Sequence, residues 1–337
     1  MNWEQLDWAA LDRLRAGFLD GGAAQGPYWQ SSADLANYDL TFAERIGWKW
    51  DAVLRELTRR DWRPRSRTIL DWGCGSGVAG RRVIAAFGAE SFDTLHVWDH
   101  SPLARDFAAA EARSEFPALH VEPFSDAGQS IGLLVISHVL NELPPETQQA
   151  LLSLVARAEA VIWVEPGNHA VSRQLIAIRE TLAPTFNIVA PCPHHGTCGL
   201  LAAGKERDWC HFFAEPPPGV QNDSQWVRFG QRVGVDLRSQ AYSYLVLERA
   251  ASDSTSEFSA LASQRSAPSD AARILGRAEH FKGFARILSC EAGGVASLEL
   301  QKRADPELYK ELKKDASYPL YRWRRDERGR IVTAERV

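Results

Sequence analysis

The stretch TILDWGCGSG, residues 68–77, constrains the fold more than any other part of this chain. A short apolar run ends on Asp71, glycines follow at every second position, and an alanine-rich pattern over Val78–Phe87 predicts a helix. The three glycines are Gly73, Gly75 and Gly77. Glycine lets a backbone pass close to a ligand, so a strand, a glycine turn and a helix N-terminus together predict a nucleotide-binding corner.

The order of residues in this loop separates cofactor classes. A dinucleotide site has G-x-G-x-x-G and a mononucleotide P-loop ends in G-K-[ST], whereas this loop reads D-x-G-x-G-x-G. The next predicted strand, Thr94–Trp98, ends on a second acid, Asp99. This arrangement resembles the first motif of class I S-adenosylmethionine (SAM)-dependent methyltransferases. The resemblance implies that the glycine loop approaches the methionine part of SAM and that Asp99 holds the ribose hydroxyls. The alternative is a structural turn in another α/β domain.

Short apolar runs alternate with helical patterns after residue 67. The runs are Thr68–Asp71, Thr94–Trp98, Leu119–Glu122, Ile131–Ser137 and Ala160–Glu165. The helical patterns are Val78–Phe87, Pro102–Phe116 and Pro144–Ala158. Continuous apolar strands are typical of parallel strands buried on both faces, so we expect an α/β fold with a doubly wound, mostly parallel sheet.

Ligands in such sheets bind at the carboxyl ends of the strands. We therefore expect the polar residues at these ends, which include Ser137, His138 and Glu165, to lie around one pocket. The SAM-binding residues that we predict are Asp71, Gly73, Gly75, Gly77, Asp99 and Ser137.

The patterns divide the chain into four regions. They are an N-terminal helical region at 1–66, a SAM-binding domain at 67–250 with a cysteine-rich insertion at 187–215, a Ser/Ala-rich linker at 251–272, and an extension at 273–337. The extension carries a predicted hairpin, Phe284–Cys290 and Val295–Gln301, and a basic tail.

Composition limits the function classes. The 337 residues are 45% hydrophobic, which is enough for a substantial core, and the net charge of −4 confines any nucleic-acid-binding surface to a local patch. The apolar runs are shorter than the ~20 residues of a membrane span, and the N-terminus lacks the basic and apolar regions of a secretory signal. We expect a cytoplasmic protein without a membrane partner.

Four of the five cysteines, Cys192, Cys198, Cys210 and Cys290, lie apart from the glycine loop, which contains Cys74. In a cytoplasmic chain such a set favours metal binding over disulfides, and four thiolates suit either zinc or an iron–sulfur cluster. The spacing C-x5-C-x11-C-x79-C lacks the paired C-x-x-C of a zinc ribbon, which weakens the case for zinc. A histidine ligand (His194, His195 or His211) remains compatible with zinc, and ordinary buried cysteines are the alternative to any metal.

A narrower resemblance rests on APCPHHGTC at 190–198 and DWCHF at 208–212, together with DWGCGSG, SHVLNEL, WVEPG, YSYLVLER, and Cys290 with the following LQKR. The chain resembles a methyltransferase-like family whose eukaryotic members act in assembly of the mitochondrial small ribosomal subunit, and it would be a bacterial relative. The resemblance covers most of residues 35–315. It implies a 4Fe-4S cluster on Cys192, Cys198, Cys210 and Cys290, and binding to small-subunit (16S) ribosomal RNA.

The catalytic residues are not evident. The segment SHVLNEL lacks the Asn/Asp-Pro-Pro-aromatic motif of base amino-group methyltransferases, and Cys74 is not placed as a nucleophile for pyrimidine methylation. His138 is a candidate base, with a hydrogen-bonded histidine at a strand end as the alternative. The chain is therefore either an rRNA methyltransferase or an assembly factor that binds SAM without using it. The competing hypothesis is a methyltransferase for a small molecule or a protein, with a structural zinc site.

The basic tail favours an RNA partner over DNA. Its cations are Lys302, Arg303, Lys310, Lys313, Lys314, Arg322, Arg324, Arg325, Arg328, Arg330 and Arg336, and its aromatic residues are Tyr309, Tyr318, Tyr321 and Trp323. Cations neutralise phosphates and exposed rings stack on unpaired bases. A mixed-charge surface helix is the alternative.

Overall fold

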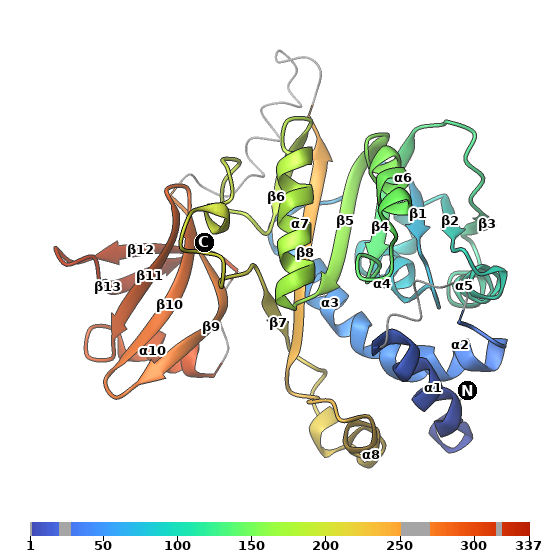
Figure 1. Ribbon diagram of the computed structural model, residues 1–337, viewed down its shortest axis with the longest axis horizontal. Coiled ribbons are helices and arrows are strands. Elements are labelled where there is room, and N and C mark those ends of the chain that lie inside the picture. Colours follow the sequence, from blue (N-terminus) through green and yellow to red (C-terminus); the bar gives the residue numbers. More distant parts are fainter. Residues whose placement is uncertain (1, 20–27, 251–269, 315–318) are drawn as a thin grey trace. The chain divides into compact units, whose positions relative to one another are not determined.

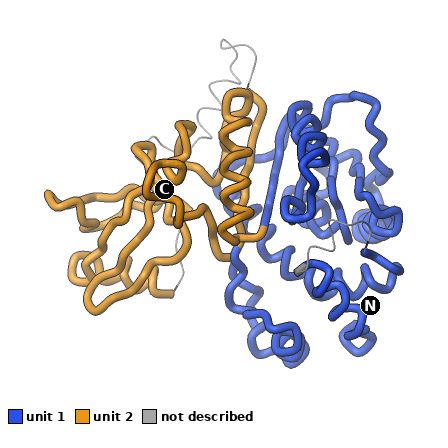
Figure 2. The backbone as a smooth tube through the Cα atoms, viewed as in Figure 1, with its two compact units in different colours: residues 1–165, 214–241 blue, residues 166–213, 242–337 orange. Residues whose placement is uncertain are grey.

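The computed structural model describes residues 2–19, 28–250, 270–314 and 319–337 (Figure 1). These residues form two compact units, one made of residues 1–165 and 214–241 and the other of residues 166–213 and 242–337 (Figure 2). Nearly all of the predicted linker, 251–272, lies outside the described residues. Gly21 and Gly22, which end the first helical pattern in the sequence, lie outside them as well.

The first unit begins with the predicted helices. They are the 3-10 turn η1 (Trp3–Gln5), α1 (Trp8–Leu19), α2 (Ser32–Tyr38), the π-helical turn η3 (Asp39–Ala43) and α3 (Glu44–Arg59). Their apolar spacing buries Leu11, Leu14 and Leu35. The arginine-rich run at 59–67, at the end of α3, contains one tryptophan, Trp62, which is fully buried.

A parallel sheet follows, and its strand order within this unit is β3-β2-β1-β4-β5. The strands are β1 (Thr68–Trp72), β2 (Thr94–Trp98), β3 (His120–Pro123), β4 (Ile131–Ser137) and β5 (Ala158–Pro166). The helices are α4 (Val78–Phe87), α5 (Pro102–Glu115), α6 (Pro145–Val155) and α8 (Ser224–Val233), with the short turns η4 (Ala89–Ser91) and η6 (Val220–Asn222). Helices α4 and α5 cover one face of the sheet and α6 the other (Figure 1), which confirms the predicted doubly wound α/β arrangement.

The second unit contains the cysteine-rich segment and a separate sheet. Its first elements are α7 (His169–Leu182), β6 (Phe186–Ala190), η5 (Gly199–Leu201), β7 (Phe212–Ala214) and β8 (Gln240–Arg249), and β8 pairs antiparallel with β6. The remaining elements are β9 (Arg273–Phe281), β10 (Phe284–Glu291), β11 (Gly294–Gln301), α10 (Pro306–Lys313), β12 (Tyr321–Arg325) and β13 (Ile331–Arg336). These last strands form a five-stranded sheet in the order β12-β13-β11-β10-β9, which confirms the predicted hairpin as β10–β11.

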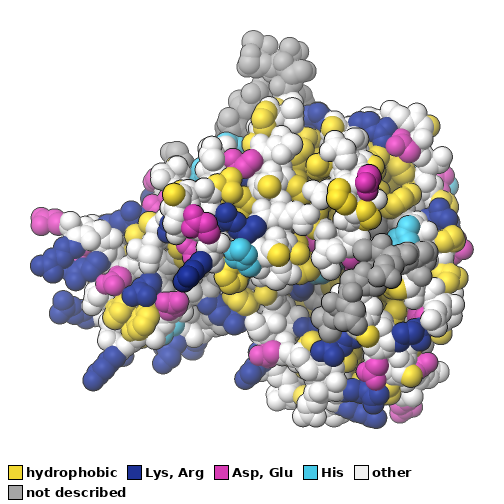
Figure 3. All heavy atoms as spheres, in the orientation of Figure 1, with side chains coloured by type: hydrophobic (Ala, Val, Ile, Leu, Met, Phe, Trp, Pro, Cys, Tyr) yellow, Lys and Arg dark blue, Asp and Glu magenta, His cyan; other side chains and the backbone are white. Residues whose placement is uncertain are grey.

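The basic tail belongs to this second sheet. It forms α10, β12 and β13, and Lys and Arg side chains gather over this part of the chain in Figure 3. Its aromatic residues point inward: Tyr309 and Tyr321 are buried in the core under α10, and Trp323 packs against the same core. The prediction that these rings are available for base stacking is therefore wrong, because they supply the apolar area that a small sheet needs. Tyr318 lies outside the described residues.

No helix in the described part of the chain has the length and apolarity needed to cross a membrane.

Candidate functional site

The glycine loop has the left-handed backbone that its sequence predicts. Gly73, Gly75 and Gly77 have φ values of +70°, +52° and +81°. A Cβ at Gly77 would lie 2.9 Å from the Cβ of Ala108, and one at Gly73 would lie 2.8 Å from Val139 Cγ1. Around Gly75 nothing lies within 4 Å of the same position. Two of the glycines are thus required by packing, and the third leaves open space beside the backbone.

Asp99 is fixed against this loop by backbone donors. Its Oδ2 accepts a hydrogen bond of 3.0 Å from Gly75 N, and its Oδ1 accepts one of 2.9 Å from Ser101 N. The loop is also tied to β2, because the N–H groups of Gly73 and Cys74 both donate to the carbonyl of Trp98. Each carboxylate oxygen has two lone pairs, so Asp99 retains acceptor capacity for a ligand.

Asp71 lies buried at the end of β1. Its Oδ2 accepts a hydrogen bond of 3.0 Å from Gly80 N in the first turn of α4, whereas its Oδ1 has no hydrogen-bond partner among the described residues. Burial raises the pKa of Asp71 to about 7, and the bond from Gly80 and the nearby Arg81 oppose that rise only in part. A buried acceptor without a partner is costly unless a ligand or water completes it.

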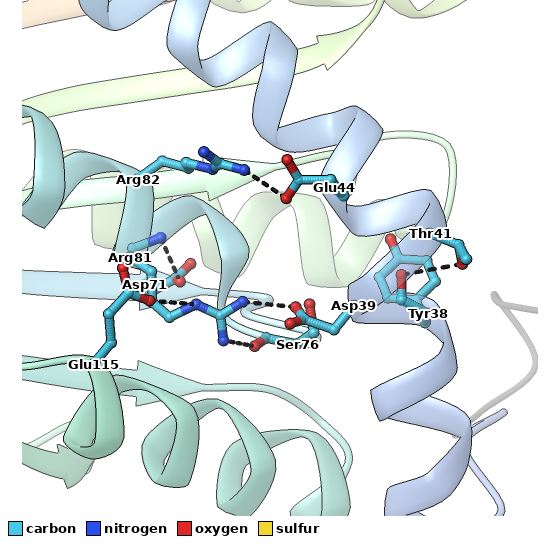
Figure 4. A network of polar contacts seen from close by, with 10 residues as sticks. Tyr38, Asp39, Thr41, Glu44, Asp71, Ser76, Arg81, Arg82 and Glu115 are labelled. Carbon is cyan, nitrogen blue, oxygen red and sulfur yellow. Dashed lines mark hydrogen bonds and ion pairs between the residues drawn. The ribbon is translucent and has the colours of Figure 1, made fainter. Parts of the chain in front are cut away.

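A network around Arg81 holds the loop on the N-terminal helices (Figure 4). Arg81 donates to Asp39 at 2.7 Å and to the backbone carbonyl of Ser76 at 3.2 Å, and it also faces Glu115. A parallel pair joins Arg82 of α4 to Glu44 of α3. Asp39 of η3 and Glu44 of α3 thus connect the N-terminal helices to α4, which follows the glycine loop directly.

The end of β4 carries a second polar group. Ser137 accepts a hydrogen bond of 2.9 Å from Trp50 Nε1, and its hydroxyl lies 3.3 Å from His138 Nδ1. His138 has a positive φ of +57°, which is uncommon for a residue with a side chain, and its Nε2 lies 3.0 Å from Lys49 Nζ. Burial and the neighbouring Lys49 lower the pKa of His138, and burial and Arg45 lower that of Lys49 to about 7. Both ring nitrogens of His138 thus have protein partners, as in the structural alternative for this histidine.

Two further acids lie near these strand ends. Glu165 Oε1 accepts hydrogen bonds from Val139 N, Leu140 N and Trp163 Nε1, and burial raises the pKa of Glu165 to about 7. Burial and repulsion from Glu165 and Asp99 raise the pKa of Glu142 to about 8.

Sequence reasoning missed Lys49, because it lies far from the sheet motifs in a helical pattern that shows only amphipathic spacing.

The four predicted ligand cysteines lie together in the second unit, apart from Cys74. Cys192 and Cys198 lie in the segment between β6 and η5, Cys210 precedes β7, and Cys290 lies on β10. Burial raises the pKa of Cys210, and the thiols of Cys192, Cys290 and Cys198 raise it further. The pKa of Cys290 is likewise raised by burial and then by Cys192 and Cys198. Neighbouring thiols thus disfavour the ionisation of Cys198, Cys210 and Cys290.

Two buried arginines border this group. Arg179 donates to the carbonyl of Gly196 at 2.7 Å. Burial lowers the pKa of Arg179, but the charges of Cys192 and Glu180 and hydrogen bonds to them raise it above its ordinary value. Arg273 donates to the carbonyl of Pro191 at 3.1 Å, and its charge lowers the pKa of Cys210 and Cys290 against the effect of burial. These cations favour negative charge on the sulfurs.

A histidine side chain lies next to one of these cysteines. His194 Nε2 lies 3.7 Å from Cys290 Sγ. Across the described ranges, no three His, Cys, Asp or Glu side chains converge closely enough to enclose a metal ion. The four cysteines therefore influence one another's pKa but do not form a closed coordination sphere, and their role as metal ligands stays a prediction.

Comparison with known proteins places the chain in a family. A family model described as mitochondrial small ribosomal subunit Rsm22 matches residues 43–318. A search of curated proteins finds no sequence match to this chain.

Solved methyltransferase structures show weak overall likeness. Magnesium protoporphyrin IX methyltransferase from Synechocystis PCC 6803, with bound SAM, is 15% identical, with coverage of 73% of this chain and 98% of that one and a TM-score of 0.39. The 16S rRNA methylase RmtB is 12% identical, with coverage of 73% and 76% and a TM-score of 0.37. An rRNA methylase from Escherichia coli is 14% identical, with coverage of 54% and 70% and a TM-score of 0.35.

The family match covers most of the chain and includes both the glycine loop and all four clustered cysteines. The chain belongs to the family of the mitochondrial small ribosomal subunit protein Rsm22.

Proposed function

We propose that this chain is a SAM-binding, iron–sulfur-containing protein that acts on the small ribosomal subunit through its 16S rRNA, as an assembly factor or as an rRNA methyltransferase. The observation that carries the proposal is that one family match spans the glycine loop, Asp99 and Cys290 together. The predicted compartment remains the cytoplasm, and the proposal includes neither a membrane nor a DNA partner.

Asp71, Asp99 and the open space beside Gly75 support SAM as the cofactor. Asp71 Oδ1 is buried without a partner, which suits an acceptor for a hydrogen bond from the ligand's amino group. Asp99 lies beside Gly75, where the backbone borders open space, and its free lone pairs suit ribose hydroxyls. The proposed cofactor-binding residues are those predicted from sequence: Asp71, Gly73, Gly75, Gly77, Asp99 and Ser137.

The donors of the cysteine group fit a metal cofactor in type. Burial and mutual repulsion keep Cys198, Cys210 and Cys290 protonated in the protein alone, since all three have a raised pKa. A metal centre displaces such protons because its ligands are thiolates. We assign Cys192, Cys198, Cys210 and Cys290 to a 4Fe-4S cluster, which would tie an irregular segment to a strand. The cationic Arg179 and Arg273 would offset the negative charge of the sulfurs.

Zinc is the second candidate for this group, and one contact favours it. His194 Nε2 lies 3.7 Å from Cys290 Sγ, and mixed imidazole and thiolate ligands are characteristic of structural zinc. Metal analysis separates the two, because an iron–sulfur cluster brings inorganic sulfide and colour.

The proposal assigns no catalytic residue. His138 is occupied on both ring nitrogens, by Lys49 and by the Ser137 hydroxyl, so it acts as a base only after one of these contacts breaks. An assembly factor needs no such base, and a methyltransferase with a poor nucleophile does. The two forms of the proposal therefore differ in whether methyl groups reach the rRNA.

The test combines calorimetry with sedimentation. We expect the intact protein to bind SAM and to co-sediment with small ribosomal subunits, with an affinity that falls steeply as salt rises. Asp71→Asn should weaken SAM binding and leave the metal content unchanged. Absence of binding to both small subunits and 16S rRNA at low salt would overturn the ribosomal function. Radiolabelled SAM then shows whether the bound rRNA gains methyl groups.

A further inference from the structure

Two stacked phenylalanine rings, an exposed Phe281 and a half-buried Phe284, close the turn between β9 and β10. Phe281 and Phe284 are cross-strand partners, and their rings are 4.7 Å apart with an interplanar angle of 10°. Phe281 is 40% exposed, which makes it the one aromatic side chain among the four large apolar residues exposed in the described part of the chain. A ring pair of this size normally lies in a core.

The sheet's own core does not need these rings. Along β9 the side chains of Ala278 and His280 face the α10 side, where Ala278 packs against the core and His280 contacts Tyr309. Successive residues of a strand point to opposite faces, so Phe281 lies on the other face. On β10 the buried Ala285 likewise turns inward and leaves Phe284 outside.

Three exposed cations lie around the ring pair. Lys282 lies in the turn itself, and the Arg286 guanidinium lies 5.0 Å from the Phe281 ring centroid. Lys302 N donates to the carbonyl of Gly283 at 2.9 Å, which places Arg303 beside the turn, whereas the Lys302 ammonium lies over the Tyr309 ring on the α10 side. Two acids are cross-strand partners of Arg286: Glu279 on β9, at 3.6 Å, and Glu299 on β11.

The region around the ring pair, residues 273–337, is positively charged like the turn itself. Residues 273–337 contain fifteen Lys and Arg and ten Asp and Glu, whereas the whole chain has a net charge of −4. Many of these cations are paired with acids, as Arg330 is with Asp326, but Lys282 and Arg303 form no ion pair among the described residues. Cations without acidic partners are those that can neutralise a phosphate.

We propose that this platform, defined as Phe281, Lys282, Phe284, Arg286 and Arg303, binds unpaired RNA by stacking a base on the Phe281 ring while the cations contact the flanking phosphates. The inference rests on the proposed function for the source of the RNA, which would be the small ribosomal subunit. Ring stacking suits any base because every base has a π-face, and duplex RNA hides its bases from such a ring.

The charge and size of the platform favour RNA over a protein or a lipid surface. A docked protein requires an apolar core of many side chains, whereas this face exposes two rings with cations around them. A membrane-binding segment would need a larger apolar face than one ring pair. A planar, anionic ligand matches both the rings and the cations.

The experiment measures binding of fluorescein-labelled oligoadenylate of twelve nucleotides to the full chain. Loss of one stacked base corresponds to roughly 5- to 100-fold weaker binding, so we expect Phe281→Ala to fall in that range. Phe281→Trp keeps an aromatic face and should bind like the original protein, while Phe281→Leu keeps apolar volume and should bind like Phe281→Ala. Because Phe281 lies at the surface, circular dichroism should show the same fold in all three variants.

The cations have their own readout. Each phosphate contact to single-stranded RNA contributes about 0.7 to the slope of log affinity against log salt. Lys282→Ala should lower that slope by about this amount, and Phe281→Ala should leave it unchanged. Equal affinity for the oligonucleotide and for a twelve-base-pair RNA duplex would overturn the stacking role, as would an unchanged affinity in Phe281→Ala.

Small-subunit binding separates this inference from the proposed function. If the original protein sediments with small subunits but Phe281→Ala binds oligoadenylate normally, the platform is refuted and the ribosomal function stands. If the oligonucleotide depends on Phe281 but small subunits do not bind, the ribosomal function fails and the platform stands. If Phe281→Ala loses the subunits but keeps the oligonucleotide, the platform contacts a ribosomal protein and the inference is wrong.

Discussion

The glycine loop and the cysteine group are built in opposite ways. In the loop, backbone N–H groups satisfy the charged side chains: Gly75 and Ser101 bind Asp99, and Gly80 binds Asp71. In the cysteine group, burial together with neighbouring thiols raises the pKa of Cys210 and Cys290. Among the described residues, the loop leaves two buried oxygens without a hydrogen-bond partner, Asp71 Oδ1 and Ser76 Oγ, whereas the thiols favour a charged state only when a positive centre joins them.

This difference indicates what each site requires. A loop made from strand ends and glycines is set by the main chain, so its ligand finds a preformed surface. Thiols that come from irregular segments and from β10 are set by side-chain burial, so their geometry depends on what they hold. We therefore expect ligand removal to change the second site far more than the first.

The largest expected effect is the loss of metal from cysteine variants. Cys192→Ser, Cys198→Ser, Cys210→Ser and Cys290→Ser should each lose essentially all iron, because a serine hydroxyl does not supply a thiolate ligand. Cys74→Ser should retain it, since Cys74 belongs to the loop. Iron and sulfide assays of protein purified without oxygen measure this, and full metal content in Cys290→Ser would refute the ligand from β10.

The next effect concerns the loop. Asp99→Ala removes a carboxylate that is proposed to accept hydrogen bonds from ribose, and such charged bonds are worth about 1.5–3 kcal/mol. SAM affinity in calorimetry should fall roughly 10- to 150-fold while iron content stays constant. Equal SAM affinity in Asp99→Ala would show that the second acid of the motif does not touch the cofactor.

Two glycine variants separate packing from ligand approach. Gly77→Ala places a Cβ 2.9 Å from Ala108 Cβ and 3.1 Å from Ala108 Cα at a φ of +81°, so it should reduce the free energy of unfolding by about 2 kcal/mol or more. Gly75→Ala meets open space at a φ of +52° and should cost about 1 kcal/mol. Its methyl group enters the space proposed for SAM, so Gly75→Ala should lower SAM affinity about tenfold. Urea unfolding and calorimetry measure the two quantities.

A further effect is a pH dependence at Lys49. Its folded pKa is about 7, below the ordinary value of about 10.4, so the unfolded chain binds more protons between these values. The Lys49 contribution therefore makes the free energy of unfolding rise with pH through this window, by up to about 1.4 kcal/mol per pH unit. Lys49→Met should flatten the rise between pH 7.5 and 9.5, and the exposed control Lys310→Met should not. An unchanged slope in Lys49→Met would show that the lysine stays protonated in the fold.

The parallel sheet could be predicted because its strands are continuous apolar runs. Thr94–Trp98 and Val78–Phe87 match the predicted bounds, since a buried parallel strand and an amphipathic helix each leave a local pattern. The loop glycines were likewise readable, because positive φ values select glycine directly. By contrast, Lys49 and His138 come together through packing of α3 on the sheet, and no local pattern records that contact.

The C-terminal end of the second unit was harder to predict because its last strands, β12 and β13, are short and carry charges. The segment Tyr321–Arg325 contains three arginines and reads as a polar tail, yet Tyr321 is fully buried and Trp323 donates to Ser289. The ring pair at Phe281 and Phe284 was missed for the converse reason, since an apolar residue in a strand pattern is normally assigned to the core. Burial of individual side chains there is decided by α10, whose position the sequence does not reveal.

The most direct test of the account is the iron and sulfide content of protein purified without oxygen, together with its visible absorbance. The account predicts about four irons and four sulfides per chain and a brown colour. One zinc per chain with no colour would contradict it, and would leave a SAM-binding fold whose cysteine group holds a different metal.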